Sequence, residues 1–262
     1  NPCIDCNRYL KFGGLYRKAA ELGCHYIVTG HYARVEFDEK LNRWLLKKSL
    51  NAAKDQSYVL YFLSQEQLSH TKFPLGEFAD KSQVRRLADK NGLINAAKRE
   101  SQDICFVPDG DYAAFIRQYR AADYPEGDFV TAYGSILGRH KGVINYTIGQ
   151  RKGLGISYSE PLYVLKKSVS DNTVTLGTER ELYSENLTAR DFNWIMYAEP
   201  PAEPINVTVR TRYHAKEATA VAEANADGTV TIRFAEPQRA ISAGQAVVLY
   251  SGDTVVGGGT IC

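Results

Sequence analysis

The chain has 262 residues, of which 44% are apolar and 24% are charged. These proportions are close to the average for soluble globular proteins and the length suits two or three domains, so the composition excludes a disordered polyelectrolyte and a fibrous repeat. The net charge is only +2, which says little about partners. Because no apolar run approaches eighteen residues and no charged-then-apolar leader precedes Asn1, we expect a cytoplasmic protein that does not enter a membrane.

The first thirty residues favour an α/β fold. Apolar residues recur at near-helical spacing over residues 7–24, and Gly23 supplies a stop. A short apolar segment, 26–31, then predicts a buried strand of a parallel sheet. Ligands of such sheets bind beyond the carboxyl ends of the strands, which makes Gly30 and His31 candidate site residues, although a lone strand-end histidine is more often structural.

The next hundred residues mix helices with a hairpin. In a helix predicted at residues 81–91, we expect Val84, Leu87 and Ala88 to face inward. The predicted elements are a hairpin of 32–37 and 43–48, a helix or buried strand at 58–63, a helix at 81–91 closed by Asn91-Gly92, and a helix at 111–120 that begins near Asp111.

After Pro125 the sequence pattern changes and predicts short strands separated by turns. Asp227-Gly228 is a strong hairpin signal. Five or more antiparallel strands near the end predict a small closed barrel, a fold that often binds nucleic acid but does not fix function. The expected strands lie at 207–213, 218–222, 230–234, 247–250 and 254–256.

A basic stripe lies between Arg139 and Lys167, with six Lys or Arg residues against a single acid, Glu160. Such a stripe suits a phosphate backbone. Taken alone, it is equally the pattern of a solvated basic face, which is the more frequent case.

The five cysteines are an odd number in a chain without an export signal, so a disulfide scaffold is not expected. Cys3 and Cys6 form a C-x-x-C pair, which supports either thiol chemistry or half of a zinc site. Cys24 and His25 are the residues available to complete such a site, but no second C-x-x-C follows. Structural zinc is therefore the minor alternative, and we assign no metal ligands.

Several segments together resemble one family, the tRNA-specific 2-thiouridylases, often called MnmA or TrmU. The run G-V-I-N-Y-T-I-G-Q-R-K-G-L-G-I is long and compositionally unusual, and the resemblance extends from the first residue to the last. The matching segments are Asn1 to Asn7 with Lys11-Phe12, Thr29 to Ala33, Lys54 to Tyr58, Ser101 to Phe106, Gly142 to Ile156, Arg210 to Tyr213, and Gly244-Gln245.

The resemblance implies an architecture and a reaction. The expected fold is an α/β part of an adenine-nucleotide-hydrolase-like catalytic domain with a parallel sheet (1–108), a small central tRNA-binding domain (109–178) and a C-terminal antiparallel β-barrel (179–262). The implied reaction replaces the 2-oxygen of the wobble uridine of tRNA with sulfur. ATP, with Mg²⁺, adenylates that oxygen, and a donor protein supplies persulfide sulfur; no DNA partner is implied.

The resemblance also assigns roles to residues. Cys105 holds the persulfide and Cys6 is the second thiol, and the two form a disulfide at the end of the cycle. Cys6 rather than Cys3 is preferred because Asn7 aligns with the motif, while Lys98, Arg99 and Lys11 are candidates for a positive setting that lowers a thiol pKa. In this light the functional interpretation of His31 and of the basic stripe outweighs the structural one. The remaining carried-over residues are Gly30 for ATP, Asn1, Pro2 and Cys3 for the target base, and His31, Lys54, Asp55, Gln56, Arg212, Tyr213 and Gln245 for tRNA.

One family motif is missing. The phosphate-cradling loop S-G-G-x-D-S does not occur in the sequence, and neither 153–155 nor 257–259 opens a helix after a buried parallel strand. We therefore expect an N-terminally truncated member that binds no ATP stably and does not thiolate tRNA by itself. Two alternatives stay open: a non-catalytic tRNA-binding remnant, and a zinc-stabilised structural protein that uses Cys3, Cys6, Cys24 and His25.

Overall fold

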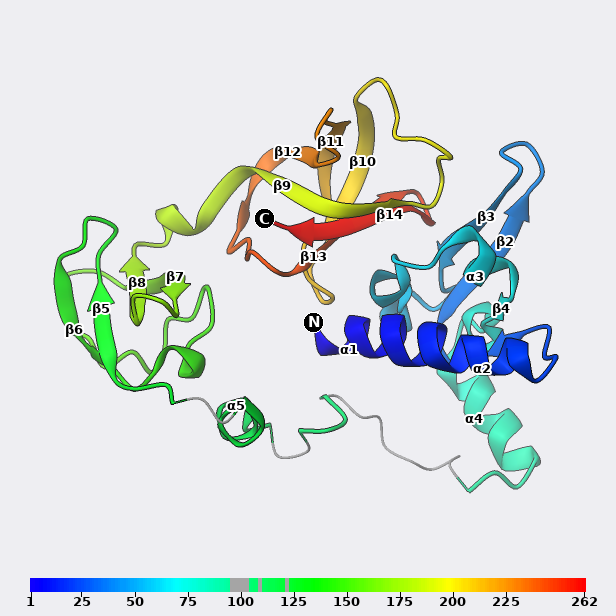
Figure 1. Ribbon diagram of the computed structural model, residues 1–262, viewed down its shortest axis with the longest axis horizontal. Coiled ribbons are helices and arrows are strands. Elements are labelled where there is room, and N and C mark those ends of the chain that lie inside the picture. Colours follow the sequence, from blue (N-terminus) through cyan, green and yellow to red (C-terminus); the bar gives the residue numbers. More distant parts are fainter. Residues whose placement is uncertain (95–103, 108–109, 121–122) are drawn as a thin grey trace. The chain divides into compact units, whose positions relative to one another are not determined.

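The computed structural model describes residues 1–94, 104–107, 110–120 and 123–262 (Figure 1). The chain divides into two compact units, each built from separate stretches of sequence. The first unit comprises Asn1–Glu100, Leu187–Ala235 and Ala243–Cys262, and the second comprises Ser101–Asn186 and Glu236–Ser242. Among the described residues, no helix combines the length and the apolar character needed to cross a membrane.

A helical segment opens the first unit. It consists of α1 (Pro2–Asp5), a π-helical stretch (Cys6–Leu15) and α2 (Tyr16–Glu21), and Gly23 follows with a φ of 73°. The predicted helix and its glycine stop are confirmed, but the helix begins earlier than expected and includes the C-x-x-C pair. Ile4 and Phe12 are buried in the core of the unit, so one face of this segment is fixed by apolar packing.

The parallel pairing predicted for the next segment is confirmed over a short length. β1 (Ile27–Val28) pairs in parallel with β4 (Thr71–Lys72). The expectation of a buried strand over 26–31 is wrong for most of its length, because β1 has only two residues, of which Ile27 is buried and Val28 is 61% exposed. A two-stranded sheet covers too little of its own faces to bury both sides of a strand.

The predicted hairpin is confirmed as β2 (Ala33–Asp38) and β3 (Arg43–Lys48). The segment expected as a helix or strand at 58–63 begins with a buried 3₁₀ turn, Ser57–Leu60, and is followed by α3 (Gln65–Ser69). α4 (Lys81–Lys90) also forms as predicted. Its apolar face is not packed inward, however: Leu87 is 51% exposed, because the helix pattern specifies a face but not an element to cover it.

Strands late in the chain close into an antiparallel barrel (Figure 1). Their order is β13-β10-β11-β12-β9-β14, and β13 also pairs with β14, which closes the circle. On the outside, β3 pairs with β14 through Lys47 and Thr254, so the early hairpin extends the barrel sheet. The barrel prediction is confirmed with β9 (Tyr183–Trp194), β10 (Ile205–Arg210), β11 (Ala218–Ala224), β12 (Val230–Arg239), β13 (Ala246–Ser251) and β14 (Thr254–Ile261).

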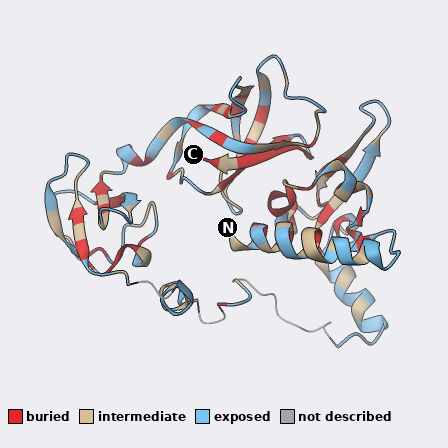
Figure 2. Ribbon diagram, viewed as in Figure 1, coloured by how far each residue is buried: buried red, intermediate tan, exposed pale blue. Residues whose placement is uncertain are grey.

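The second unit contains α5 (Tyr112–Arg120) and a four-stranded sheet in the order β6-β5-β8-β7. Asp111 caps α5 as predicted, since its Oδ1 accepts the Ala114 N–H at 2.9 Å. Phe129, Val164 and Val174 lie at the centre of the core of this unit, and Figure 2 shows the buried positions along its strands. The strands are β5 (Gly127–Val130), β6 (Ile136–His140), β7 (Tyr163–Ser168) and β8 (Thr173–Gly177).

Candidate functional site

A buried ion-pair network fixes one of the predicted polar loops. The carboxylate of Asp55 accepts hydrogen bonds from the Ser49 and Ser57 N–H groups, both at 3.2 Å, and from the Ser57 hydroxyl at 2.9 Å. Arg210 Nη1 lies 3.0 Å from the same carboxylate, and Arg210 Nη2 lies 2.9 Å from Glu217. The Asp55 side chain is 1% exposed. Its oxygens are therefore occupied inside the protein, and Asp55 holds the loop rather than facing solvent.

The network continues around Tyr250. Lys48 lies 2.6 Å from Glu217, and its Nζ stands 4.3 Å from the centre of the Tyr250 ring, while the Arg210 guanidinium stands 5.2 Å from the same ring. Burial alone would raise the pKa of Glu217, but hydrogen bonds from Lys48 and Thr208 and the charge of Arg210 keep that pKa below its usual value. Glu217 is thus held as a carboxylate between two cations.

Tyr213 lies beside this network at the end of β10. Its ring packs on Tyr58 with centroids 6.0 Å apart, and burial is the main cause that raises its pKa, followed by the charge of Asp55. Gln56 is hydrogen-bonded to Tyr213, and the charge of Cys3 also raises the pKa of Tyr213. Gln56 is itself fixed by Tyr32, whose N–H donates to its Oε1 at 2.9 Å. The loop 54–57, the N-terminal helix and the end of β10 therefore meet at Tyr213.

The beginning of the N-terminal helix is well defined. Asn1 caps α1, because its Oδ1 accepts the Cys3 N–H at 3.1 Å, and Pro2 takes the first helical position. Cys3 is exposed and Cys6 is partly buried. The Nδ2 of Asn7 donates to the carbonyl of Val59 at 3.3 Å, and its buried Oδ1 has no partner among the described residues. The motif asparagine thus anchors the helix that carries both thiols.

Two further predicted residues lie close to the same tyrosines. The positive charge of Arg212 acts on Tyr58, whose pKa is raised chiefly by burial, and the Tyr58 hydroxyl donates to the Ala246 carbonyl at 2.8 Å. Gln245 immediately precedes Ala246 and accepts the Ile261 N–H at 2.8 Å. Lys54 is partly buried in the same loop as Asp55. The structure therefore gathers most of the predicted tRNA-contacting residues around Tyr58 and Tyr213.

His31 is placed elsewhere, in an apolar setting. It is 7% exposed, its ring lies about 6 Å from the rings of Phe12 and Phe73, and its Nδ1 is 2.8 Å from the Thr29 hydroxyl. Burial, and secondarily the charge of Lys11, lowers its pKa to about 4, so it is neutral at pH 7. Next to it, Gly30 is exposed, and the atom nearest to an added Cβ is Leu75 Cδ1 at 3.6 Å. The backbone of Gly30 is therefore open to a ligand.

Cys105 belongs to the second unit, whereas Cys6 belongs to the first. It is exposed, and Val107 two residues later is 2% exposed and anchors its segment. Residues 101–103, the beginning of its motif, and the predicted cations Lys98 and Arg99 lie outside the described residues. All five cysteines lie in the described part of the chain, and none of them forms a disulfide there.

The basic stripe is less uniform than its sequence indicates. Arg139 lies 2.7 Å from the Asp128 carboxylate, and the Nζ of Lys167 donates to the Tyr146 carbonyl at 2.7 Å. Burial lowers the pKa of Lys167. Arg151, Lys152 and Lys166 are exposed. Lys141 is exposed as well, so four cations of the stripe present positive charge without, among the described residues, a bond that holds them to the protein surface, as Arg139 and Lys167 have.

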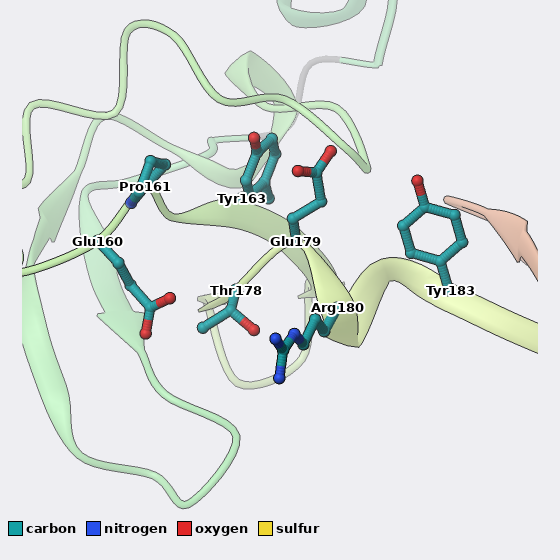
Figure 3. A pocket seen from close by; sticks show the side chains of 7 residues that line it. All are labelled: Glu160, Pro161, Tyr163, Thr178, Glu179, Arg180 and Tyr183. Carbon is teal, nitrogen blue, oxygen red and sulfur yellow. The ribbon is translucent and has the colours of Figure 1, made fainter.

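The second unit also contains a cavity of about 680 Å³ (Figure 3). Its wall combines two tyrosine rings with side chains of both charges, and it contains no thiol. None of the predicted site residues lines it. The lining residues are Glu160, Pro161, Tyr163, Thr178, Glu179, Arg180 and Tyr183.

Sequence reasoning missed Lys48, Arg210, Glu217 and Tyr250 as members of the site. These residues are spread over four strands or strand ends, and Arg210 and Asp55 are separated by 155 positions. No local spacing reveals such a network. The one available signal was the alternation along β10, which places Arg210 on the opposite face from Val207 and Val209.

The chain matches three family descriptions in succession. Residues 1–109 match "tRNA methyl transferase HUP domain", residues 113–178 match "tRNA methyl transferase PRC-barrel domain" and residues 184–261 match "Aminomethyltransferase beta-barrel domain". The chain is also 53% identical over 261 residues to a protein named tRNA-specific 2-thiouridylase MnmA 1 from Caldanaerobacter subterraneus. The matched region covers 100% of this chain and 71% of the relative. The chain belongs to the tRNA-specific 2-thiouridylase family.

Further relatives support the same family. A tRNA-specific 2-thiouridylase MnmA from Acetivibrio thermocellus is 50% identical, and one from Clostridioides difficile is 47% identical, each over 261 residues, 100% of this chain and 72% of the relative. The family resemblance drawn from the motifs is therefore confirmed. The zinc alternative gains no support, since Cys3, Cys6, Cys24 and His25 are all described and no group of three or more potential ligands forms among the described residues.

Proposed function

We propose that this chain acts in tRNA 2-thiolation, the transfer of persulfide sulfur to C2 of the wobble uridine. The observation that carries the proposal is that Tyr213 packs on Tyr58, is hydrogen-bonded to Gln56 and lies within electrostatic reach of Cys3, on the helix that also carries Cys6. The names of the relatives, which match along the whole chain, support the same function. The domain boundaries 1–108, 109–178 and 179–262 and a cytoplasmic location belong to this proposal.

The proposed chemistry uses two thiols. The Cys105 thiolate receives sulfane sulfur from a persulfide-carrying donor protein, and the terminal sulfur attacks C2 of the uridine, whose 2-oxygen has been activated by adenylation and leaves with AMP. The Cys6 thiolate then attacks the inner sulfur of Cys105, which breaks the S–S bond and releases 2-thiouridine. The product is a Cys6–Cys105 disulfide, which an external thiol reduces before the next cycle.

The residues around Tyr213 supply tRNA binding in this proposal. Arg212 and Lys54 provide positive charge for phosphates, while Tyr213, Gln56 and Gln245 provide ring and amide groups. Asp55 acts through Arg210 and Ser57, which fix the loop and β10 relative to each other. Asn1, Pro2 and Cys3 contact the target base. His31 is buried, so we propose that it shapes the end of β1 rather than carrying charge to the RNA.

We propose ATP as the co-substrate, bound with its adenosine part near Gly30 at the carboxyl end of β1. The open backbone of Gly30 fits such an approach. The sequence contains no S-G-G-x-D-S loop for the phosphates. We therefore propose that the chain thiolates tRNA only when another polypeptide segment supplies this loop, and that by itself it binds tRNA without reaction.

The test uses two measurements. The first is binding of tRNA to the chain itself; the second is 2-thiouridine, measured by mass spectrometry of digested tRNA, for the chain joined to the N-terminal segment of the Caldanaerobacter relative. Cys105→Ser and Cys6→Ser should each abolish thiolation and leave tRNA affinity unchanged. Cys24→Ser is the matched control, since Cys24 is exposed like Cys105 and has no proposed role. Thiolation by the Cys105→Ser protein would refute the mechanism.

The exposed cations of the basic stripe, such as Arg151, Lys152 and Lys166, favour one second candidate, a non-catalytic tRNA-binding protein. This alternative predicts salt-dependent tRNA binding and a cellular function that survives replacement of both Cys6 and Cys105. Loss of that function in either variant would exclude it.

A further inference from the structure

Three aromatic rings, one tilted and two stacked, lie in a row in the second unit and are called the stack below; the first of them, Phe106, directly follows Cys105. Phe106 lies 5.1 Å from Phe115, with the ring planes inclined at 40°. Phe115 lies 4.3 Å from Tyr119, with the planes at 26°, which is a stacked pair. Phe115 and Tyr119 are one helical turn apart on α5, so the helix aligns them and Phe106 adds to the row from the preceding segment.

Both ends of the stack are open to solvent. Phe106 is 46% exposed and Tyr119 is 69% exposed, whereas the Phe115 ring between them is partly covered. The stack is nevertheless well anchored, because Val107 is buried beside Phe106 and Asp111 caps α5. An exposed row of large rings on an anchored helix offers flat apolar surface to a ligand.

The charge around the stack indicates what kind of ligand fits. α5 has the sequence YAAFIRQYR and therefore carries two cations and no acid. Arg120 is exposed and follows Tyr119 directly in the last turn of α5. Arg117 lies two positions from both Phe115 and Tyr119, which places it on another side of the helix, and its Nη2 donates to the Asn145 Oδ1 at 3.5 Å. Flat rings beside an exposed arginine match an anionic chain that bears flat rings, which is the chemistry of single-stranded nucleic acid.

We propose that Phe106, Phe115 and Tyr119 form a stacking platform for an unpaired base of the tRNA substrate, next to the Cys105 thiol. Arg120 contacts a flanking phosphate. An enzyme that modifies a base has to take it out of its stack, and an external aromatic face replaces part of the stacking that is lost. This inference rests on the proposed function, since it assumes that tRNA is the ligand.

The test measures the affinity of an anticodon stem-loop RNA for the full chain by fluorescence anisotropy. Tyr119→Leu and Phe106→Leu each keep an apolar side chain but remove the π face, and each should weaken binding roughly 10- to 100-fold. Tyr119→Phe retains the ring and should bind like the parent. Tyr133→Leu is the matched control, because Tyr133 is 97% exposed in the same unit but lies outside the stack. Equal affinity for Tyr119→Leu, Phe106→Leu and Tyr133→Leu would overturn the proposal.

Crosslinking gives an independent readout. Loop RNA that carries 5-iodouridine should crosslink under ultraviolet light to a peptide containing Phe106 or Tyr119, and crosslinks confined to other peptides would overturn the platform. Arg212→Ala separates this inference from the proposed function. If Arg212→Ala weakens binding and the stack variants do not, only the platform fails; if the parent chain does not bind tRNA at all, the proposed function fails as well.

Discussion

Replacing Asp55 with Ala tests whether the buried network supports the site. The change removes four acceptor contacts and leaves the Arg210 guanidinium, whose side chain is only 16% exposed, with Glu217 as its remaining carboxylate partner. Breaking a buried ion pair by removing one partner costs about 3–5 kcal/mol, and the remaining Glu217 contact favours the lower end of that range. For a unit of this size, a loss of about 3 kcal/mol corresponds to a fall of roughly 6–12 °C in Tm.

The assay is thermal unfolding followed by circular dichroism, with Glu223→Ala as the control. Glu223 also pairs with an arginine, Arg233, at 2.7 Å, but that pair lies on the barrel surface with side chains 39% and 59% exposed. An exposed pair contributes about 0–1 kcal/mol, so Glu223→Ala should change Tm little. The same Asp55→Ala protein should bind tRNA more weakly, because Gln56 and Tyr213 lose their support. If both variants unfold within about 2 °C of each other, the network does not stabilise the fold as argued.

Three further outcomes follow from the structure. The folded-state pKa of His31, about 4, lies below its ordinary value of 6.5, so the unfolded chain binds the proton first and stability should fall as the pH drops from 6.5 to 4. His31→Gln should reduce this loss of stability by up to about 3 kcal/mol, and urea unfolding midpoints at both pH values measure it. Gly76→Ala should destabilise the protein severely, since an added Cβ would meet the Ala33 carbonyl oxygen at 1.7 Å, whereas Gly14→Ala, with its nearest atom at 3.6 Å, should unfold at or above the parent temperature. Binding of tRNA by the chain should weaken steeply with salt, and Lys152→Ala should reduce the slope of log Kd against log salt by about 1.

The local parts of the fold could be predicted from the sequence because short-range physics determines them. Alternating apolar residues such as Val207 and Val209 marked the barrel strands, and Asp227-Gly228 marked a hairpin turn in which Gly228 has a φ of 81°. The expected inward face of α4 was wrong, because Leu87 satisfies the periodicity of a packed helix without any neighbour that covers it.

Many of the residues that belong to the site could be predicted from the sequence, but the contacts between them could not. The family motifs placed Asp55 and Tyr213 among the residues of interest, yet only the structure shows that Asp55 is occupied by Arg210 and two serines while Tyr213 lies next to Gln56. Burial of a charged residue depends on partners that are distant in sequence, and Arg210 lies 155 positions away. The roles of Cys6 and Cys105 stay predictions.

The pairing of β3 with β14 has a consequence for synthesis of the chain. On the side of β3 away from β2, Lys47 pairs with Thr254, so the first unit is incomplete until residues 254–261 have left the ribosome. At 5–20 residues per second, that strand follows the hairpin by roughly 10–40 s. During this interval the outer edge of β3 is unpaired and open to other strands, while the intervening second unit is already largely available to fold. Pairing of β14 with β3 is therefore the closing step for the sheet that the β2–β3 hairpin begins.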